Sequence, residues 1–375
     1  MGKKRFKEVG EGSFFGRWLY ERVVPRDHFL VQLNEVIDWE AFVPVLLSTY
    51  EGMGERGRPP YSPVVILKML VISYLYDLSE RQTEEVVNYH LPVKEFVGLA
   101  VDEPAPDHST MSLFKRRLGA AGCWEELERI GEMVLEQAQE AGIRMGPIQV
   151  VDSVHTVADV DKEADRRRQE EGKRPRDPQA QVVKKGRRRK VGPDGKVKAE
   201  EVQYLGYKSH VSLNAETGLI TTIWPTRGGA ADNEQFPYLL AHDEEVGVGA
   251  EIYSGDRAYD DSDLHWRLWE RGKASALALK TYRTRKKDAH KEPWLAMLQS
   301  SAYKRGQAER YKVERKFGEA KRWHGFGRCR YLGLVRYGIQ AHLTALVLNL
   351  KRIVYLLRGI RFRPAARKEK RLAPA

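Results

Sequence analysis

The stretch that decides the fold is IQVVDSVHTV, residues 148–157. It is a short apolar run of the kind that forms a buried β-strand, with Asp152 at its centre. The apolar members of the run are Ile148, Val150, Val151, Val154 and Val157. An isolated carboxylate in a buried strand is costly unless it is paired or binds a metal ion. Asp152 is therefore the first candidate for a functional side chain.

Charge is the most informative feature of the composition. The 375 residues include 64 Lys and Arg against 52 Asp and Glu, a formal net charge of +12. Such an excess favours a polyanionic partner through phosphate contacts and release of counterions. Cys123 and Cys329 do not have the spacing of a disulfide framework or a Cys-based zinc site. The first residues lack a signal-peptide pattern and the apolar run 337–350 is too short for a membrane span, so we expect a soluble, cytoplasmic protein.

The chain before the first strand has the signals of helices. Capping residues, proline and apolar runs predict helices over 62–75 and 79–89, from 107 onward, and over 124–141. The third helix carries Lys115, Arg116 and Arg117, which are candidates for DNA contact. Short helices with one basic member favour a helix-turn-helix-like module, although a helical dimerisation or packing domain explains the pattern equally well.

A basic insert follows the first strand. Residues 161–200 have little apolar content and carry fifteen Lys or Arg against eight Asp or Glu. This composition predicts a solvated loop or disordered insert, which we place at 161–202. The insert could also follow DNA phosphates, and the candidate contacts are Arg187, Arg188, Arg189 and Lys190.

The remaining elements alternate between strands and helices. The pattern predicts a hairpin over 207–224, a helix capped by Asp232 and Asn233, strands at 251–254 and 275–279, a helix after Asp261, a helix at 307–323 and a long helix at 334–357. This order predicts an α/β (α+β) fold with a mixed sheet flanked by helices.

Two further carboxylates complete a candidate site. Asp256 directly follows a predicted strand, and ligand sites gather at the carboxyl ends of strands in open sheets; taken alone, Asp256 could equally cap a turn. Glu314 shares a helical face with Arg310 and Lys321, whose spacing would let both contact phosphate. Glu309 and Glu319 are competing acids on other sides of that helix. Ion pairing within the helix is the simpler explanation of Arg310 and Lys321, worth about 0.3–0.5 kcal/mol.

Three converging carboxylates suit two Mg²⁺ ions, which prefer oxygen ligands and clamp the attacking and leaving oxygens of a phosphodiester. For His155 and His210 a hydrogen-bonded role is favoured over metal ligation, and His324 is expected in a loop. The sequence contains no H-E-x-x-H, Walker or G-x-G-x-x-G pattern, which argues against metalloprotease, P-loop and dinucleotide-binding functions.

Several of these motifs resemble those of bacterial insertion-sequence transposases of the DDE class. The segments GRPPYSP (57–63), LYDLSER (75–81) and PDHST (106–110) resemble the N-terminal domain of that family. The segments VDSVHT (151–156) and GDRAY (255–259) resemble those that hold its first and second catalytic Asp. Arg310, Glu314 and Lys321 match most of its Tyr-x2-Arg-x3-Glu-x6-Lys signature, which departs here at Gln307.

The resemblance implies an RNase H-like catalytic domain at 148–330, a helical DNA-binding or dimerisation domain at 1–147, and a C-terminal helix with a basic tail at 331–375. It implies catalysis by Asp152, Asp256 and Glu314 with two Mg²⁺ ions, for which Mn²⁺ can substitute. The implied partner is double-stranded DNA, as terminal inverted repeats and as target, bound by a homodimer near the bacterial nucleoid. A nuclease that never joins ends, or a non-catalytic DNA-binding descendant, remains an alternative.

Overall fold

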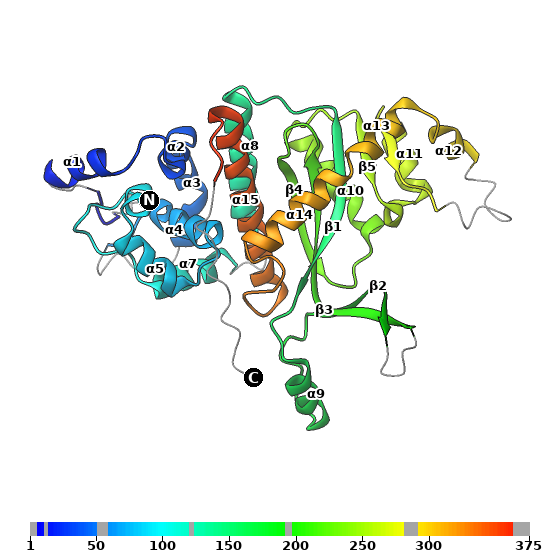
Figure 1. Ribbon diagram of the computed structural model, residues 1–375, viewed down its shortest axis with the longest axis horizontal. Coiled ribbons are helices and arrows are strands. Elements are labelled where there is room, and N and C mark those ends of the chain that lie inside the picture. The colour runs from blue at the N-terminus through cyan, green and yellow to red at the C-terminus, as the bar shows by residue number, and fades with distance from the viewer. Residues whose placement is uncertain are drawn as a thin grey trace. The chain divides into compact units, whose positions relative to one another are not determined.

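The computed structural model describes residues 6–10, 14–50, 59–119, 124–191, 197–280 and 292–362 (Figure 1). By its internal contacts the chain divides into two compact units. We call Met1–Arg117 with Leu346–Ala375 the helical unit, and Leu118–Ala345 the sheet unit. The domain boundaries expected at residues 147 and 330 differ from this division, and they stay a prediction.

The helical unit is built around one almost completely buried helix, α4. Every residue of α4 except Lys68 is buried, and the Ser62 side chain caps it by accepting a hydrogen bond from the Val64 amide. The capping box of Ser79 and Gln82 is also present, so both helix starts are confirmed. The helices of this part of the chain are α1 Phe14–Val23, α2 Phe29–Val36, η1 Glu40–Phe42, α3 Val43–Leu46, η2 Leu47–Tyr50, α4 Pro63–Leu75, α5 Glu80–Tyr89, α6 Leu91–Val97 and α7 His108–Leu118.

The sheet unit contains a mixed sheet. Its strands are β1 Ile148–Val157, β2 Gln181–Val191, β3 Val197–Asn214, β4 Ile220–Arg227, β5 Ile252–Gly255 and β6 Ala274–Leu277. The order across the sheet is β4-β3-β1-β5-β6, and β2 pairs with the first part of β3. β3 runs antiparallel to β1 and β4, whereas β1, β5 and β6 run parallel. This is the arrangement of an RNase H-like sheet, and the predicted fold class is confirmed.

Helices cover both faces of this sheet. One face packs on α10 and α11, where Phe236 and Leu268 join Tyr253 and Leu277 in an apolar core. The other face packs on α13, whose Gly306 lies against side chains of β5 and β6 that alternate with those of the core. The helices of the sheet unit are α8 Glu125–Glu140, α9 Lys162–Glu170, α10 Asp232–Glu245, α11 Ser262–Glu270, α12 Glu292–Met297, α13 Ser301–Glu309 and α14 Tyr311–Trp323; the long helix α15, Leu334–Arg358, continues into the helical unit.

The predicted loop at 161–200 is wrong. The segment forms α9 and then a ribbon of β2 with the first part of β3 (Figure 1). Asp161 caps α9 by accepting hydrogen bonds from the Glu163 and Ala164 amides. In the ribbon, Arg187 and Arg188 stand opposite Glu201 and Glu200. Backbone pairing stabilises this ribbon, which low apolar content alone would not predict.

Two local predictions also need correction. Asp232 does not cap α10, because the N-cap residue is Ala231 and Asp232 already belongs to the helix. The helix expected at 307–323 begins earlier, at Ser301, and is divided at Arg310 into α13 and α14. Arg310 itself has helical φ and ψ angles of −57° and −34°, so the two helices share one path.

Among the residues whose structure is described, no helix has both the length and the apolar character required to cross a membrane. Cys329 is a free, buried thiol. Cys123 lies outside the described residues.

Candidate active site

The first two predicted acids lie on neighbouring strands. β1 and β5 run parallel, and their last paired residues are Val150 and Ser254. Asp152 and Asp256 each follow two residues later, so both lie at the same end of this strand pair. The Asp256 carboxylate also accepts a hydrogen bond of 2.8 Å from the Ala258 amide and caps the short helix η3, Arg257–Tyr259. Asp256 therefore caps a turn and also lies at the same end of the strand pair as Asp152.

Gly255 makes this close arrangement of strands sterically possible. A Cβ atom at that position would lie 2.9 Å from a Leu277 methyl and 3.1 Å from both Tyr259 and Val151. Any larger residue would require these side chains to move.

Electrostatics distinguish Asp152 within the site. Burial raises the pKa of Asp152 to about 7, and the charge of Asp256 acts in the same direction. A hydrogen bond of 2.7 Å from the Ser153 amide and the charge of Arg310 oppose the rise. Two carboxylates that raise each other's cost of ionisation are a suitable place for a cation.

A third acid, Asp232, belongs to this environment and was missed as a site residue. Burial acts to raise its pKa, but the hydrogen bond from His210 and the charge of Lys208 outweigh burial and lower it to about 2. Its Oδ1 lies 3.1 Å from Lys208 Nζ and 3.2 Å from His210 Nδ1. Lys208 and His210 are two residues apart in β3, and that spacing on one strand face was the available sequence signal.

Tyr259 lies among these acids. Its side chain is fully buried, and its hydroxyl has no hydrogen-bond partner within the described part of the chain. Burial raises its pKa well above the ordinary value, and the charges of Asp232, Asp152 and Asp256 add to the rise. An unpaired buried hydroxyl normally costs about 1–3 kcal/mol, which a ligand or water in the site would relieve.

Glu314 is not brought together with the two strand aspartates. Its side chain is 56% exposed, and its Oε1 lies 3.2 Å from Arg310 Nη2 in an i,i+4 ion pair. Over the described ranges no group of three or more His, Cys, Asp or Glu side chains is arranged to hold a metal ion. The competing acids are also paired, Glu309 with Lys312 and Glu319 with Lys316. In this structure Arg310 therefore forms an ion pair within the helix, as the simpler explanation expected.

A cavity of about 540 Å³ opens beside Asp256. It lies between α13 and the ends of β5 and β6, and Arg310 reaches its wall from the junction of α13 and α14. The lining residues are Asp256, Arg257, Ala278, Leu279, Leu298, Tyr303, Gln307 and Arg310. Two arginines and one aspartate among the lining residues could bind a phosphodiester next to an acidic site.

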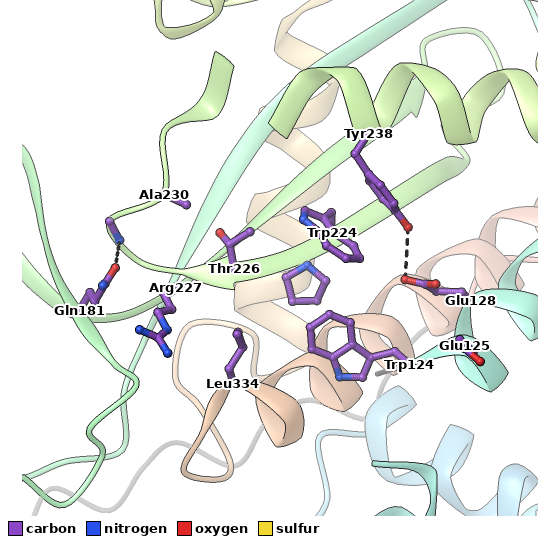
Figure 2. A pocket seen from close by; sticks show the side chains of 12 residues that line it. Trp124, Glu125, Glu128, Gln181, Trp224, Thr226, Arg227, Ala230, Tyr238 and Leu334 are labelled. Carbon is purple, nitrogen blue, oxygen red and sulfur yellow. Dashed lines mark hydrogen bonds between the residues drawn. The ribbon is translucent and has the colours of Figure 1, made fainter. Parts of the chain in front are cut away.

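A second cavity of about 730 Å³ lies at β4 and has a different character (Figure 2). The Trp224 ring packs on Tyr238 with centroids 4.1 Å apart, and edge-on against Trp124 at 5.8 Å. Figure 2 shows the Tyr238 hydroxyl donating to Glu128, at 3.4 Å. None of the acids predicted for catalysis lines this cavity, so we place the candidate active site at the first one.

The other predicted DNA contacts have unequal exposure. Lys115 is buried and forms an ion pair with Glu80, so DNA contact would require that pair to open. Arg117 lies over the Tyr50 ring, whereas Arg116 and Lys321 are exposed. The backbone of Arg187, Arg188, Arg189 and Lys190 lies in β2, but their side chains are outside the described part of the structure.

The hydrogen-bonded role expected for His210 is confirmed, because its Nε2 lies 2.9 Å from the Thr226 hydroxyl and its Nδ1 faces Asp232. His155 is half-buried on β1. His324 is the C-cap of α14, where the expected loop begins, and its side chain is fully buried.

A divalent cation fits the chemistry of the strand pair. Asp152 and Asp256 supply carboxylate oxygens, which Mg²⁺ and Mn²⁺ prefer, and a bound cation would offset the burial and the charge of Asp256 that together raise the pKa of Asp152. Lys208 and His210 are already engaged by Asp232. The unpaired Tyr259 hydroxyl adds an unused polar group beside the same acids.

Comparison with family models matches two segments of the chain to transposase families. Residues 19–117 match the family described as Transposase domain (DUF772). Residues 152–350, more than half of the chain, match the family described as Transposase DDE domain, and that match begins at Asp152 and includes Asp256 and Glu314. Enzymes of the DDE class act on DNA and generally use divalent metal ions. The chain belongs to the DDE transposase family.

Proposed function

We propose that this chain is a catalytically active DDE transposase that cuts DNA at the terminal inverted repeats of an insertion sequence and joins the freed 3′-ends to target DNA. The observation that carries the proposal is the placement of Asp152 and Asp256 at the same end of the parallel β1–β5 pair, beside a cavity with two arginines. The finer subclass with the Tyr-x2-Arg-x3-Glu-x6-Lys signature is part of this proposal.

Asp152 and Asp256 would hold the metal ions from the strand ends, and Glu314 would complete the set from α14. When bound, two Mg²⁺ ions would neutralise charge on the attacking and leaving oxygens of the phosphodiester, and Mn²⁺ would serve in their place. Glu314 is now paired with Arg310, so its recruitment requires that pair to open. Such an exposed pair is worth about 0.3–0.5 kcal/mol, so opening it is inexpensive.

Arg310 would then be free to contact phosphate. Arg310 and Arg257 both line the cavity, which supports a role in holding the scissile strand. Lys321 lies further along α14, where its exposed side chain would contact the backbone beyond the cut.

Asp232 would keep the interior of the site ordered. Its ion pair with Lys208 and its hydrogen bond with His210 tie α10 to β3, the strand that pairs with β1. Both partners are buried, so they are fixed in place rather than available to DNA.

The reaction needs two steps at phosphodiester bonds, a hydrolysis and then a strand transfer. Water attacks the phosphate at the element's end, and the bond to the 3′-oxygen breaks to leave a 3′-hydroxyl. That hydroxyl then attacks a target phosphate in line, and the target's own 3′-oxygen leaves. No covalent protein intermediate is required, because positioning and electrostatic stabilisation act on both steps.

Two ends must be held together for this reaction, so we propose a homodimer in the DNA complex. The helical unit, with Arg116 on α7, and the β2–β3 ribbon with Arg187, Arg188, Arg189 and Lys190 would bind the inverted repeats. These partners, and an association with the nucleoid, follow from the DNA substrate.

The test uses the full-length protein, a duplex carrying the element's end, a supercoiled target plasmid and Mg²⁺. We expect nicking at the end and covalent joining into the plasmid, both lost in Asp152→Asn, Asp256→Asn and Glu314→Gln. Glu319→Gln, on the same helix as Glu314, is the matched control and should stay active. Cutting without joining would identify a nuclease, and metal-independent binding without cutting would identify a non-catalytic DNA-binding protein.

A further inference from the structure

The side-chain amide of Gln307 joins α13 to the ends of two strands. Its Nε2 donates to the Gly255 carbonyl at 3.0 Å and to the Ala276 carbonyl at 2.5 Å. Gly255 is the last residue of β5 and directly precedes Asp256, and Ala276 lies in the neighbouring strand β6. One side chain thus holds the two strand ends that border the cavity beside Asp256.

The adjacent residue, Gly306, allows α13 to approach the sheet this closely. A Cβ atom at Gly306 would lie 2.5 Å from Ala276 Cβ and 3.1 Å from an Ile252 methyl. Gly306 is also the residue of α13 that is buried. The helix therefore packs with its backbone close to β5 and β6, which brings the Gln307 amide within reach of their carbonyl oxygens.

Gln307 also begins the row of residues that leads to Glu314. α13 and α14 share one path through Arg310, so Gln307, Arg310 and Glu314 are spaced three and four residues apart on one helical face. Fixing Gln307 on the strand ends therefore fixes the height and rotation of that face relative to Asp256.

We infer that Gln307 is a positioning residue that sets the location of Arg310 and Glu314 relative to Asp256; this inference rests on the proposed function. The family signature has Tyr at this position, and a phenol has a single O–H donor. An amide NH₂ has two N–H donors, and here it donates one hydrogen bond to a carbonyl of β5 and one to a carbonyl of β6. The departure from the signature thus replaces a side chain with one donor by one that binds two main-chain carbonyls.

The first test measures the structure of the metal-free protein. Gln307→Glu keeps the size of the side chain but places a carboxylate against two carbonyl oxygens. We expect faster amide hydrogen–deuterium exchange across 301–323 than in the wild type. Gln299→Glu makes the same chemical change at an exposed position before α13 and should leave exchange unchanged. Wild-type exchange in Gln307→Glu would overturn the inference, whether or not the protein transposes DNA.

The second test measures function. In Gln307→Glu the Mg²⁺ concentration for half-maximal cleavage should rise on the order of tenfold, since two hydrogen bonds that position Glu314 are lost. As the pH falls, the Mg²⁺ concentration that Gln307→Glu needs for half-maximal cleavage should approach the wild-type value. The reason is that a protonated carboxyl can donate one hydrogen bond. Gln307→Ala should show the same Mg²⁺ defect without recovery at low pH.

The outcomes separate the two proposals. A wild-type protein that never cuts DNA would refute the proposed function, while the exchange measurement would still decide the role of Gln307. Wild-type Mg²⁺ dependence in both Gln307 variants, or an equal defect in Gln299→Glu, would overturn the positioning role. Full activity in Gln307→Tyr would also contradict the need for two donated bonds.

Discussion

The two strand aspartates and the helix glutamate of the candidate site are held in different ways. Asp152 and Asp256 follow paired residues of parallel strands, so backbone pairing brings them together without help from their side chains. Glu314 lies on a helix surface, where its carboxylate is free to pair with Arg310 one turn earlier. Two of the three candidate acids therefore lie together in this structure, whereas the proposed role of Glu314 requires its ion pair with Arg310 to open.

The largest effect is expected from the strand aspartates. Asp152→Asn or Asp256→Asn should lower cleavage of end DNA on the order of a thousandfold, because either change removes a metal-binding carboxylate and its charge. Neither variant should bind Mn²⁺ measurably by calorimetry without DNA. Asp263→Asn, an exposed change in the first turn of α11, serves as the control. Strong residual Mn²⁺ binding in Asp152→Asn would contradict a site formed in advance.

Glu314→Gln should impair cleavage but leave metal binding by the two strand aspartates intact. We expect cleavage to fall on the order of a hundredfold, since positioning of the reacting groups suffers. Calorimetry should still find one Mn²⁺ ion on the DNA-free protein, held by Asp152 and Asp256. Loss of that ion in Glu314→Gln would mean that the glutamate already belongs to the resting site.

Asp152 also makes the stability of the protein depend on pH. Its pKa rises from 3.8 to about 7 on folding, so the folded state binds more protons in this window and stability falls as the pH rises through it. The contribution has a slope of up to about 1.4 kcal/mol per pH unit. Asp152→Asn should remove this slope in denaturant unfolding between those pH values. An unchanged slope would show that Asp152 ionises normally in the folded protein.

The smallest effect concerns the ion pair of Arg310 and Glu314. Both side chains are partly exposed, so Glu314→Gln should change the free energy of unfolding by less than about 0.5 kcal/mol. Urea unfolding of this variant beside Glu319→Gln would measure the difference. A loss above 1 kcal/mol would show that Glu314 is fixed in the resting structure rather than available for recruitment.

Prediction from the sequence succeeded where the signals were local. The caps at Ser62 and Ser79, the strand at 148–157 and the helix capped by Asp261 were all found, because each depends on neighbouring residues. The ribbon of β2 and β3 was missed because composition does not reveal pairing between segments. Asp232 was mistaken for a helix cap because its partners Lys208 and His210 lie on a distant strand.

The sequence by itself determined many of the local elements, such as β1 and the helices that begin after Ser62, Ser79 and Asp261, and it named the three candidate acids, since local periodicity and short motifs carry that information. Only the tertiary structure decided which of those acids meet. Asp152 and Asp256 are about a hundred residues apart and become neighbours through the register of β1 on β5. The Gln307 amide likewise donates to the Gly255 and Ala276 carbonyls only because Gly306 allows α13 to pack close to the sheet. Strand pairing and close packing join residues that are far apart in the sequence, and no local pattern encodes such contacts.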